Sequence, residues 1–167
     1  MAEPYEVDLA GGYHVSTDPR RLEPLPVWAF LHRQSAWARG IPYEVVVRTL
    51  EHSLNFGLLS PDEEQVGFSR VITDYGPFAY LCDVYVLAEH RGRGLGRALV
   101  AAVLSHPGLQ NLRRIALDTA SPHFYEPFGF RSLEDPTTHL ERRRTVQDLW
   151  PAPPAAASDN TVRPLEP

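Results

Sequence analysis

The sequence predicts a single α+β domain with a mostly antiparallel sheet. Three apolar segments, 54–59, 65–73 and 78–87, follow one another with short polar turns between them, as in an antiparallel meander. The third segment runs through a glycine-arginine turn directly into an amphipathic helix. The 167 residues suffice for one core that buries roughly two thirds of the unfolded surface.

Two short strands and two helices are predicted ahead of this meander. The strands fall at 13–16 and, across a Gly-Gly turn, at 5–9. A helical region opens at Asp18 or Pro19, and an imperfect apolar stripe continues to Trp37. Pro42 suits the first turn of a second helix over 43–52, with inward-facing side chains at Val46, Val47 and Leu50.

The helix after the glycine-arginine turn should span 94–105. Its apolar positions fall at i, i+3, i+4, i+7 and i+8, and Pro107 ends it. A strand at 114–117, a short helix at 122–128 and final strands at 130–133 and 138–143 are expected to follow. The domain should end at residue 149, because residues 150–167 are too rich in proline and small residues to form a core and predict a flexible tail.

The turn between strand and helix has the chemistry of a pyrophosphate site. Glycines at 92, 94 and 96 allow close backbone approach, and the first amides of a helix lack intrahelical partners. The helix dipole and the guanidinium groups of Arg91, Arg93 and Arg97 would add positive charge there. The ordinary alternative is a plain strand-to-helix turn with a solvated arginine face.

Two other glycine-loop functions do not fit. A P-loop requires a lysine after its second glycine, and this chain contains no lysine. A dinucleotide-binding fold requires a different glycine spacing and a longer chain, although Asp118 lies near the distance of its acidic residue.

Composition restricts the partners. A net charge of −5 argues against general nucleic-acid binding, and the run Arg142-Arg143-Arg144 is typical of a solvated edge. The absence of a long apolar run or a signal pattern, with one cysteine, predicts a soluble cytoplasmic protein without a membrane partner. Cys82 is expected to pack rather than react, and the spacing of the histidines predicts no metal.

The loop sequence Arg91-Gly92-Arg93-Gly94-Leu95-Gly96 resembles the signature of the GCN5-related N-acetyltransferase (GNAT) superfamily. The resemblance covers roughly residues 20 to 145 and includes Tyr125-Glu126-Pro127-Phe128-Gly129-Phe130. The segments 40–42, 66–68 and 71–75 are similar to a small, uncharacterised bacterial subgroup. The resemblance implies the GNAT fold: a single mixed, mostly antiparallel twisted sheet of six to seven strands, splayed at the cofactor site and flanked by about four helices.

The resemblance also implies an acetyl-CoA-dependent N-acetyltransferase that moves an acetyl group to a primary amine of a small molecule or peptide, in a ternary complex. The pantetheine arm would bind between the splayed strands. The implied coenzyme A contacts are Val84, Tyr85 and Val86 on the strand, and Arg91, Gly92, Arg93, Gly94, Leu95, Gly96 and Arg97 on the loop and helix. An acyl-CoA sensor without turnover is the alternative, because Thr119-Ala120 replaces an Arg-Asp pair that is usual in the subgroup.

Catalytic residues are implied in the same way. Tyr125 occupies the family's general-acid position and would protonate the departing thiolate. Asp83 is the first candidate for the base, with a buried carboxylate paired with an arginine as the equal alternative. Glu44, Asp74, His52, His123 or a water chain are weaker candidates. Trp37, Asp74 and His123 are predicted to contact the acceptor, and Trp28 is a further option. The oligomeric state stays open, with a homodimer among the options.

Overall fold

The computed structural model describes residues 3–150, apart from the side chains of Val146 and Gln147. Six strands form one open sheet in sequence order. Strands β1 to β5 pair antiparallel, and β6 joins β5 in parallel, so the mixed, mostly antiparallel sheet is confirmed. The strands are β1 (Glu6–Asp8), β2 (His14–Ser16), β3 (Leu54–Leu59), β4 (Gln65–Thr73), β5 (Phe78–Val86) and β6 (Arg114–Ala116).

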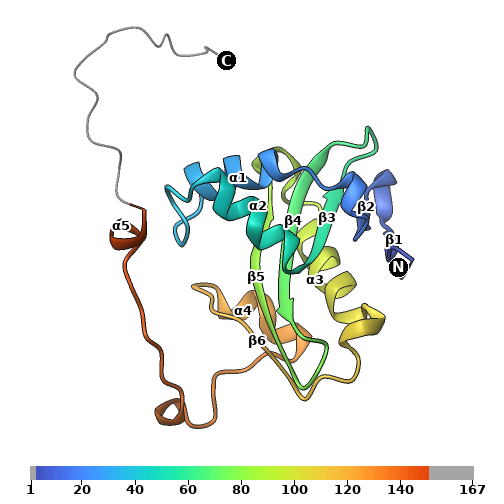
Figure 1. Ribbon diagram of the computed structural model, residues 1–167. Coiled ribbons are helices and arrows are strands. Elements are labelled where there is room, and N and C mark those ends of the chain that lie inside the picture. The colour runs from blue at the N-terminus through green and yellow to red at the C-terminus, as the bar shows by residue number, and fades with distance from the viewer. Residues whose placement is uncertain (1–2, 151–167) are drawn as a thin grey trace, which may run out of the picture.

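Helices cover both faces of the sheet (Figure 1). α1 (Pro24–Arg33) and α2 (Tyr43–Glu51) lie on one face, and α3 (Leu95–Ser105) lies on the other. α4 (Pro122–Tyr125) follows β6, and α5 (Val146–Leu149) lies near the end of the described chain. Short 3-10 turns occur at Ala10–Gly12, Pro19–Arg21, Ala88–His90, Pro107–Leu109, Glu126–Phe128 and Pro136–Thr138.

Each face of the sheet has its own hydrophobic core. The α3 core joins Leu95, Leu99 and Val103 to the fully buried Phe56 and Leu58 of β3. The α1/α2 core contains buried side chains from both helices and from two strands, with the rings of Phe30 and Tyr85 stacked at 3.7 Å. The apolar positions predicted for the helix at 94–105 therefore do face the sheet, whereas α1 buries Val27, Phe30 and Leu31 and leaves Leu25 exposed.

A β-bulge in β5 reverses the face of the sheet to which alternate side chains of the strand point. Phe68 of β4 pairs with Tyr85 and Arg70 pairs with Cys82, so Ser69 alone lies opposite two residues, Asp83 and Val84. Asp83 has a φ of 54°, which a residue other than glycine adopts only when its surroundings fix it. Before the bulge Leu81 packs in the α3 core, and after it Tyr85 packs in the α1/α2 core.

β5 and β6 separate just before this bulge. They pair only over Phe78–Tyr80 and Arg114–Ala116, although β5 continues to Val86. The remaining edge of β5 has no strand partner within residues 3–150. This opening is the splay that the resemblance implied.

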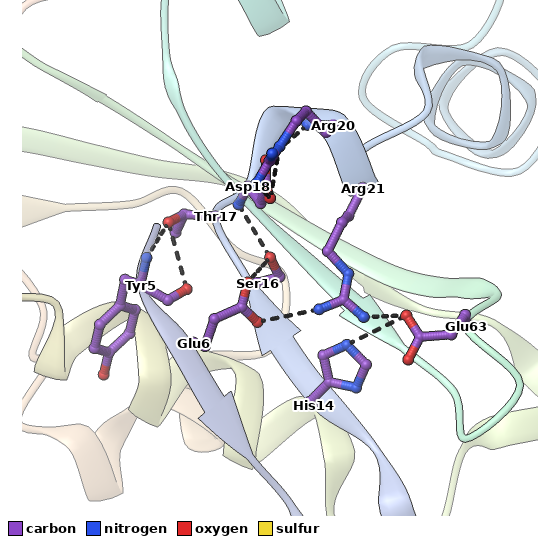
Figure 2. A network of polar contacts seen from close by, with 9 residues as sticks. All are labelled: Tyr5, Glu6, His14, Ser16, Thr17, Asp18, Arg20, Arg21 and Glu63. Atoms are coloured by element: carbon purple, nitrogen blue, oxygen red, sulfur yellow. Dashed lines mark hydrogen bonds and ion pairs between the residues drawn. The ribbon is translucent and has the colours of Figure 1, made fainter. Parts of the chain in front are cut away.

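A polar network connects the short N-terminal strands to the β3–β4 turn (Figure 2). Arg21 contacts the carboxylates of Glu6 in β1 and Glu63 in the β3–β4 turn. Asp18 accepts hydrogen bonds from the backbone and guanidinium of Arg20, which hold its carboxyl pKa near 2. The network ties β1 and the 3-10 turn at Pro19–Arg21 to the rest of the sheet.

The predicted strands at 130–133 and 138–143 are wrong, because the structure assigns no strand to either segment. Asp135 instead caps the 3-10 turn at Pro136–Thr138 by accepting from the backbone of Thr137. Leu140 is 90% exposed, and the charged residues that follow it give the segment no apolar face with which to pack on the sheet. Beyond Trp150, the predicted tail lies outside the described residues. Along residues 3–150, every helix falls short of the length and apolarity that a membrane crossing requires.

Candidate functional site

A cavity of about 1470 Å³ occupies the opening beside β5. One wall is β5 from Tyr80 to Val86, and another is the loop and helix start between His90 and Arg97. The segment from Leu117 to Ser121 and the α4 residues Phe124 and Tyr125 close the opposite side. The cavity therefore lies where β5 and β6 have separated and reaches the N-terminus of α3.

The loop before α3 presents unpartnered backbone amides. Gly92 and Gly94 have φ values of 75° and 76°, which are accessible to glycine with little strain. Gly94 is the N-cap of α3 and has no side-chain cap, and the first helical hydrogen bond there joins Ala98 N–H to Gly94 O. The amides of the first turn are thus available to an anion at the positive end of the helix dipole.

The three predicted arginines have different surroundings. Arg91 and Arg97 line the cavity, and Arg91 Nε donates to Val86 O at 2.8 Å. Arg93 does not line the cavity, because its guanidinium donates to the hydroxyl of Tyr13 at 3.1 Å. That hydroxyl also contacts His90 Nδ1 at 2.9 Å, so Arg93 fastens the loop to the chain ahead of β2.

The free edge of β5 includes the two valines predicted to contact the cofactor. Leu87 N–H donates to Val66 O across β4, and backbone polar groups alternate in direction along a strand. The peptide groups of Val86 and Val84 therefore point away from β4, toward the opening. The contact between Arg91 and Val86 O agrees with this direction. Tyr85 is also a lining residue, although its side chain is buried in the α1/α2 core.

Asp83 is a buried carboxylate with both oxygens engaged. Oδ2 accepts from Arg70 Nε at 2.7 Å and Oδ1 accepts from Trp37 Nε1 at 3.0 Å. Arg70 in turn donates to Ser53 Oγ at 3.1 Å. The geometry is that of the arginine-paired alternative, and it joins the bulge in β5 to the α1–α2 loop that carries Trp37. Burial and the Asp83 charge raise the pKa of the neighbouring Cys82 thiol to about 12, which keeps it protonated.

Tyr125 faces the cavity from α4. Its ring makes edge-on contacts with Phe124 and Phe130, at 4.9 and 5.9 Å between centroids, and packs against the α3 core. Burial raises the pKa of the phenol above its ordinary value of 10.0. The side chain therefore stays protonated at neutral pH, as a proton donor requires.

The predicted acceptor residues do not all reach the cavity. Trp37 lines it, with 52% of its surface exposed. Asp74 lies in the exposed β4–β5 turn, where it accepts from the backbone of Gly76, and His123 points outward to pair with Glu126. Trp28 is held in the α1/α2 core by a bond to Ile41 O. The weaker base candidates Glu44 and His52 are likewise absent from the lining.

The sequence analysis did not place Tyr80 or Asp118 in the acyl-transfer site. The hydroxyl of Tyr80 on β5 donates to Asp118 Oδ2 at 3.1 Å, and both residues line the cavity. In the sequence, Asp118 is recognisable as a carboxylate two positions beyond a short strand. Only the pairing of β6 with β5, however, places it beside Tyr80. No three histidine, cysteine or acidic side chains gather as a metal site in the part of the chain that the structure describes.

Comparison with known proteins gives a consistent result. A family model described as the acetyltransferase (GNAT) family matches residues 21–130. A Gibberella zeae protein with the provisional name of an acetyltransferase is 36% identical over 129 residues, which are 65% of this chain and 72% of that protein.

Solved structures show the same architecture. A provisionally assigned acetyltransferase of the GNAT family from Xanthomonas campestris pv. campestris is 45% identical, with a TM-score of 0.77 over 79% of this chain and 93% of that one. AAC(6')-Iy, solved with the bisubstrate analogue CoA-S-monomethyl-acetylneamine, is 24% identical, with a TM-score of 0.53 over 72% of this chain and 92% of that one. The second likeness concerns the fold alone.

Proposed function

Because the chain belongs to the acetyltransferase (GNAT) family, we propose that it transfers an acetyl group from acetyl-CoA to a primary amine of a small molecule or peptide. The observation that carries this proposal is the cavity, which extends from uncapped amides at the start of α3 to the free edge of β5. A diphosphate and an extended pantetheine arm match these two features in charge and shape. The proposed acetyltransferase domain occupies residues 1–149.

In the proposed complex, the diphosphate accepts hydrogen bonds from the amides between Gly92 and Arg97. Arg91 and Arg97 add charge from the cavity wall. The pantetheine arm lies along the peptide groups of Val84 and Val86, in the place that a further strand would occupy. The solved complex of AAC(6')-Iy with a CoA-containing analogue supports a coenzyme site in this fold.

The transfer is a direct displacement. The amine nitrogen attacks the thioester carbonyl carbon, the C–S bond breaks, and the sulfur leaves with the bonding electron pair. Tyr125 donates its proton to that thiolate and regains one from solvent, and the nitrogen loses a proton to solvent. A free backbone N–H on the exposed edge of β5 would stabilise the developing oxyanion.

We assign Asp83 a positioning role within this scheme. Its two oxygens already accept from Arg70 and Trp37, so accepting a proton would disrupt a buried ion pair. The carboxylate instead holds the bulge that turns Val84 toward the gap and the loop that brings Trp37 to the cavity.

Turnover tests the proposal. Release of free CoA thiol from acetyl-CoA is measured across a panel of amines for the wild type, Tyr125→Phe and Tyr75→Phe. Tyr75 lies in the exposed β4–β5 turn outside the cavity and serves as the matched control. We expect kcat to fall about a hundredfold in Tyr125→Phe and to stay unchanged in Tyr75→Phe. Tight CoA binding without turnover on any amine would identify the acyl-CoA sensor instead.

A further inference from the structure

The cavity contains one carboxylate that the proposed mechanism does not use. Its described lining includes two acidic residues, Asp83 and Asp118. Asp83 is neutralised by Arg70 at 2.7 Å. Asp118 is exposed to the cavity and forms no ion pair among residues 3–150. Its charge is therefore available to a ligand.

Tyr80 fixes the position of this carboxylate. The phenol donates to Asp118 Oδ2 at 3.1 Å, and Oδ1 has no hydrogen-bond partner in the described part of the chain. Burial and the bond to Asp118 raise the pKa of Tyr80 to about 12, so the phenol remains a donor. One oxygen is thus held by the protein, while the other is free to accept from a bound group.

The location suits the acceptor rather than the cofactor. Ala116 pairs with Tyr80 in parallel register, so Asp118, two residues later, lies level with Cys82 at the point where the strands separate. Tyr80 lies on the sheet face opposite Leu81, whose side chain packs in the α3 core. Asp118 is therefore on the α1/α2 side of the sheet, the side from which Trp37 reaches the cavity.

The cavity also offers aromatic groups to a cation, beside the four arginines that line it, Arg91, Arg97, Arg143 and Arg144. Trp37, Tyr80 and Tyr125 all line the cavity, and aromatic faces attract ammonium groups. Arg143 and Arg144 also line it from the C-terminal segment, and Arg143 donates to Glu141 at 3.0 Å. Neither arginine forms an ion pair with Asp118.

We propose that Asp118, positioned by Tyr80, binds the acceptor as its ammonium form and thereby selects cationic primary amines over neutral molecules of the same shape. The inference rests on the proposed function and names the substrate class of that site. The ammonium donates a charge-assisted hydrogen bond to Asp118 Oδ1, and aromatic side chains contact it from the cavity wall. The ammonium then loses its proton to solvent before attack.

The test compares amines with their alcohol isosteres. Butylamine, putrescine and 2-phenylethylamine, and the matching alcohols, are titrated into the protein saturated with CoA. We expect the wild type to bind at least one amine about tenfold or more tightly than its alcohol. Asp118→Asn should reduce that ratio to about one, while Asp62→Asn, an equal charge change in the exposed β3–β4 turn, should preserve it.

Tyr80→Phe tests whether Asp118 binds the amine itself or only holds the Tyr80 side chain in place. It leaves the charge of Asp118 in place, so we expect a several-fold loss of amine affinity, smaller than in Asp118→Asn. A larger loss in Tyr80→Phe than in Asp118→Asn would overturn the proposal. The proposal is also overturned if the wild type binds CoA but binds none of the amines more tightly than the matching alcohol, whether or not it binds either compound. Failure to bind CoA at all would instead refute the proposed function.

Discussion

Replacing Asp83 by asparagine isolates the charge of the buried Asp83–Arg70 pair at the cavity wall. Asparagine keeps an acceptor for Trp37 Nε1 and tolerates the positive φ of this position. The change therefore removes mainly the attraction to Arg70, whose side chain is only 13% exposed, against 8% for Asp83. Leaving one buried charge without its partner costs about 3 to 5 kcal/mol.

For a chain of this length, a loss of about 3 kcal/mol lowers Tm by roughly 6 to 12 °C. Urea unfolding followed by circular dichroism measures the free energy directly. Arg70→Met should recover part of the loss in the Asp83→Asn background, because it removes the unpaired guanidinium. A loss below about 1 kcal/mol in Asp83→Asn would refute the assignment of a structural ion pair.

The same variant separates a positioning role from a catalytic base. If Asp83 only holds the bulge and Trp37, Asp83→Asn assayed below its lowered Tm should raise KM and leave the shape of the kcat–pH profile unchanged. If Asp83→Asn removes the acid limb of that profile, and Arg70→Met does not restore it, Asp83 is instead the proton acceptor.

Three further predictions concern the core, the loop and pH. Phe56→Ala should destabilise the protein by about 3 to 5 kcal/mol in urea unfolding, because this ring is fully buried in the α3 core, and a loss under 1 kcal/mol would contradict the packing. Gly94→Val should weaken CoA binding by calorimetry at least tenfold, because valine disfavours the φ of 76° that shapes the loop; unchanged affinity would exclude the loop from the site. Burial lowers the pKa of His106 below its ordinary value of 6.5, and its Nδ1 accepts from Gly108 N–H. As the pH falls, His106 is protonated in the unfolded chain before it is protonated in the folded one. The free energy of unfolding should therefore be highest above pH 6.5 and decline below it. Urea midpoints at pH 7.5 and 5.0 should show a smaller decline in His106→Asn, and equal declines would disprove this assignment.

Local patterns were sufficient to predict most of the sheet. The segments 54–59 and 65–73 form strands with the expected bounds, because short apolar runs bounded by turn residues specify them locally. The helix after the glycine loop was also predicted within a residue at its start. Its apolar stripe and the proline beyond its end are both local signals.

Features that depend on pairing between distant segments were not predictable. The bulge at Asp83 requires a left-handed conformation in a residue that rarely adopts it, and the partners that impose it, Arg70 and Trp37, lie 13 and 46 positions away. The contact between Tyr80 and Asp118 likewise depends on the register of β5 with β6. The segments at 130–133 and 138–143 have strand-like composition, yet no strand pairs with them in the described structure.

Calorimetric titration with CoA and with pantetheine, which lacks the diphosphate, tests the phosphate-binding loop most directly. The unpartnered amides at the start of α3 predict one CoA bound per chain, at least tenfold more tightly than pantetheine, with the difference decreasing as salt is added. Equal affinity for the two compounds, or no heat of binding with CoA, would contradict the account.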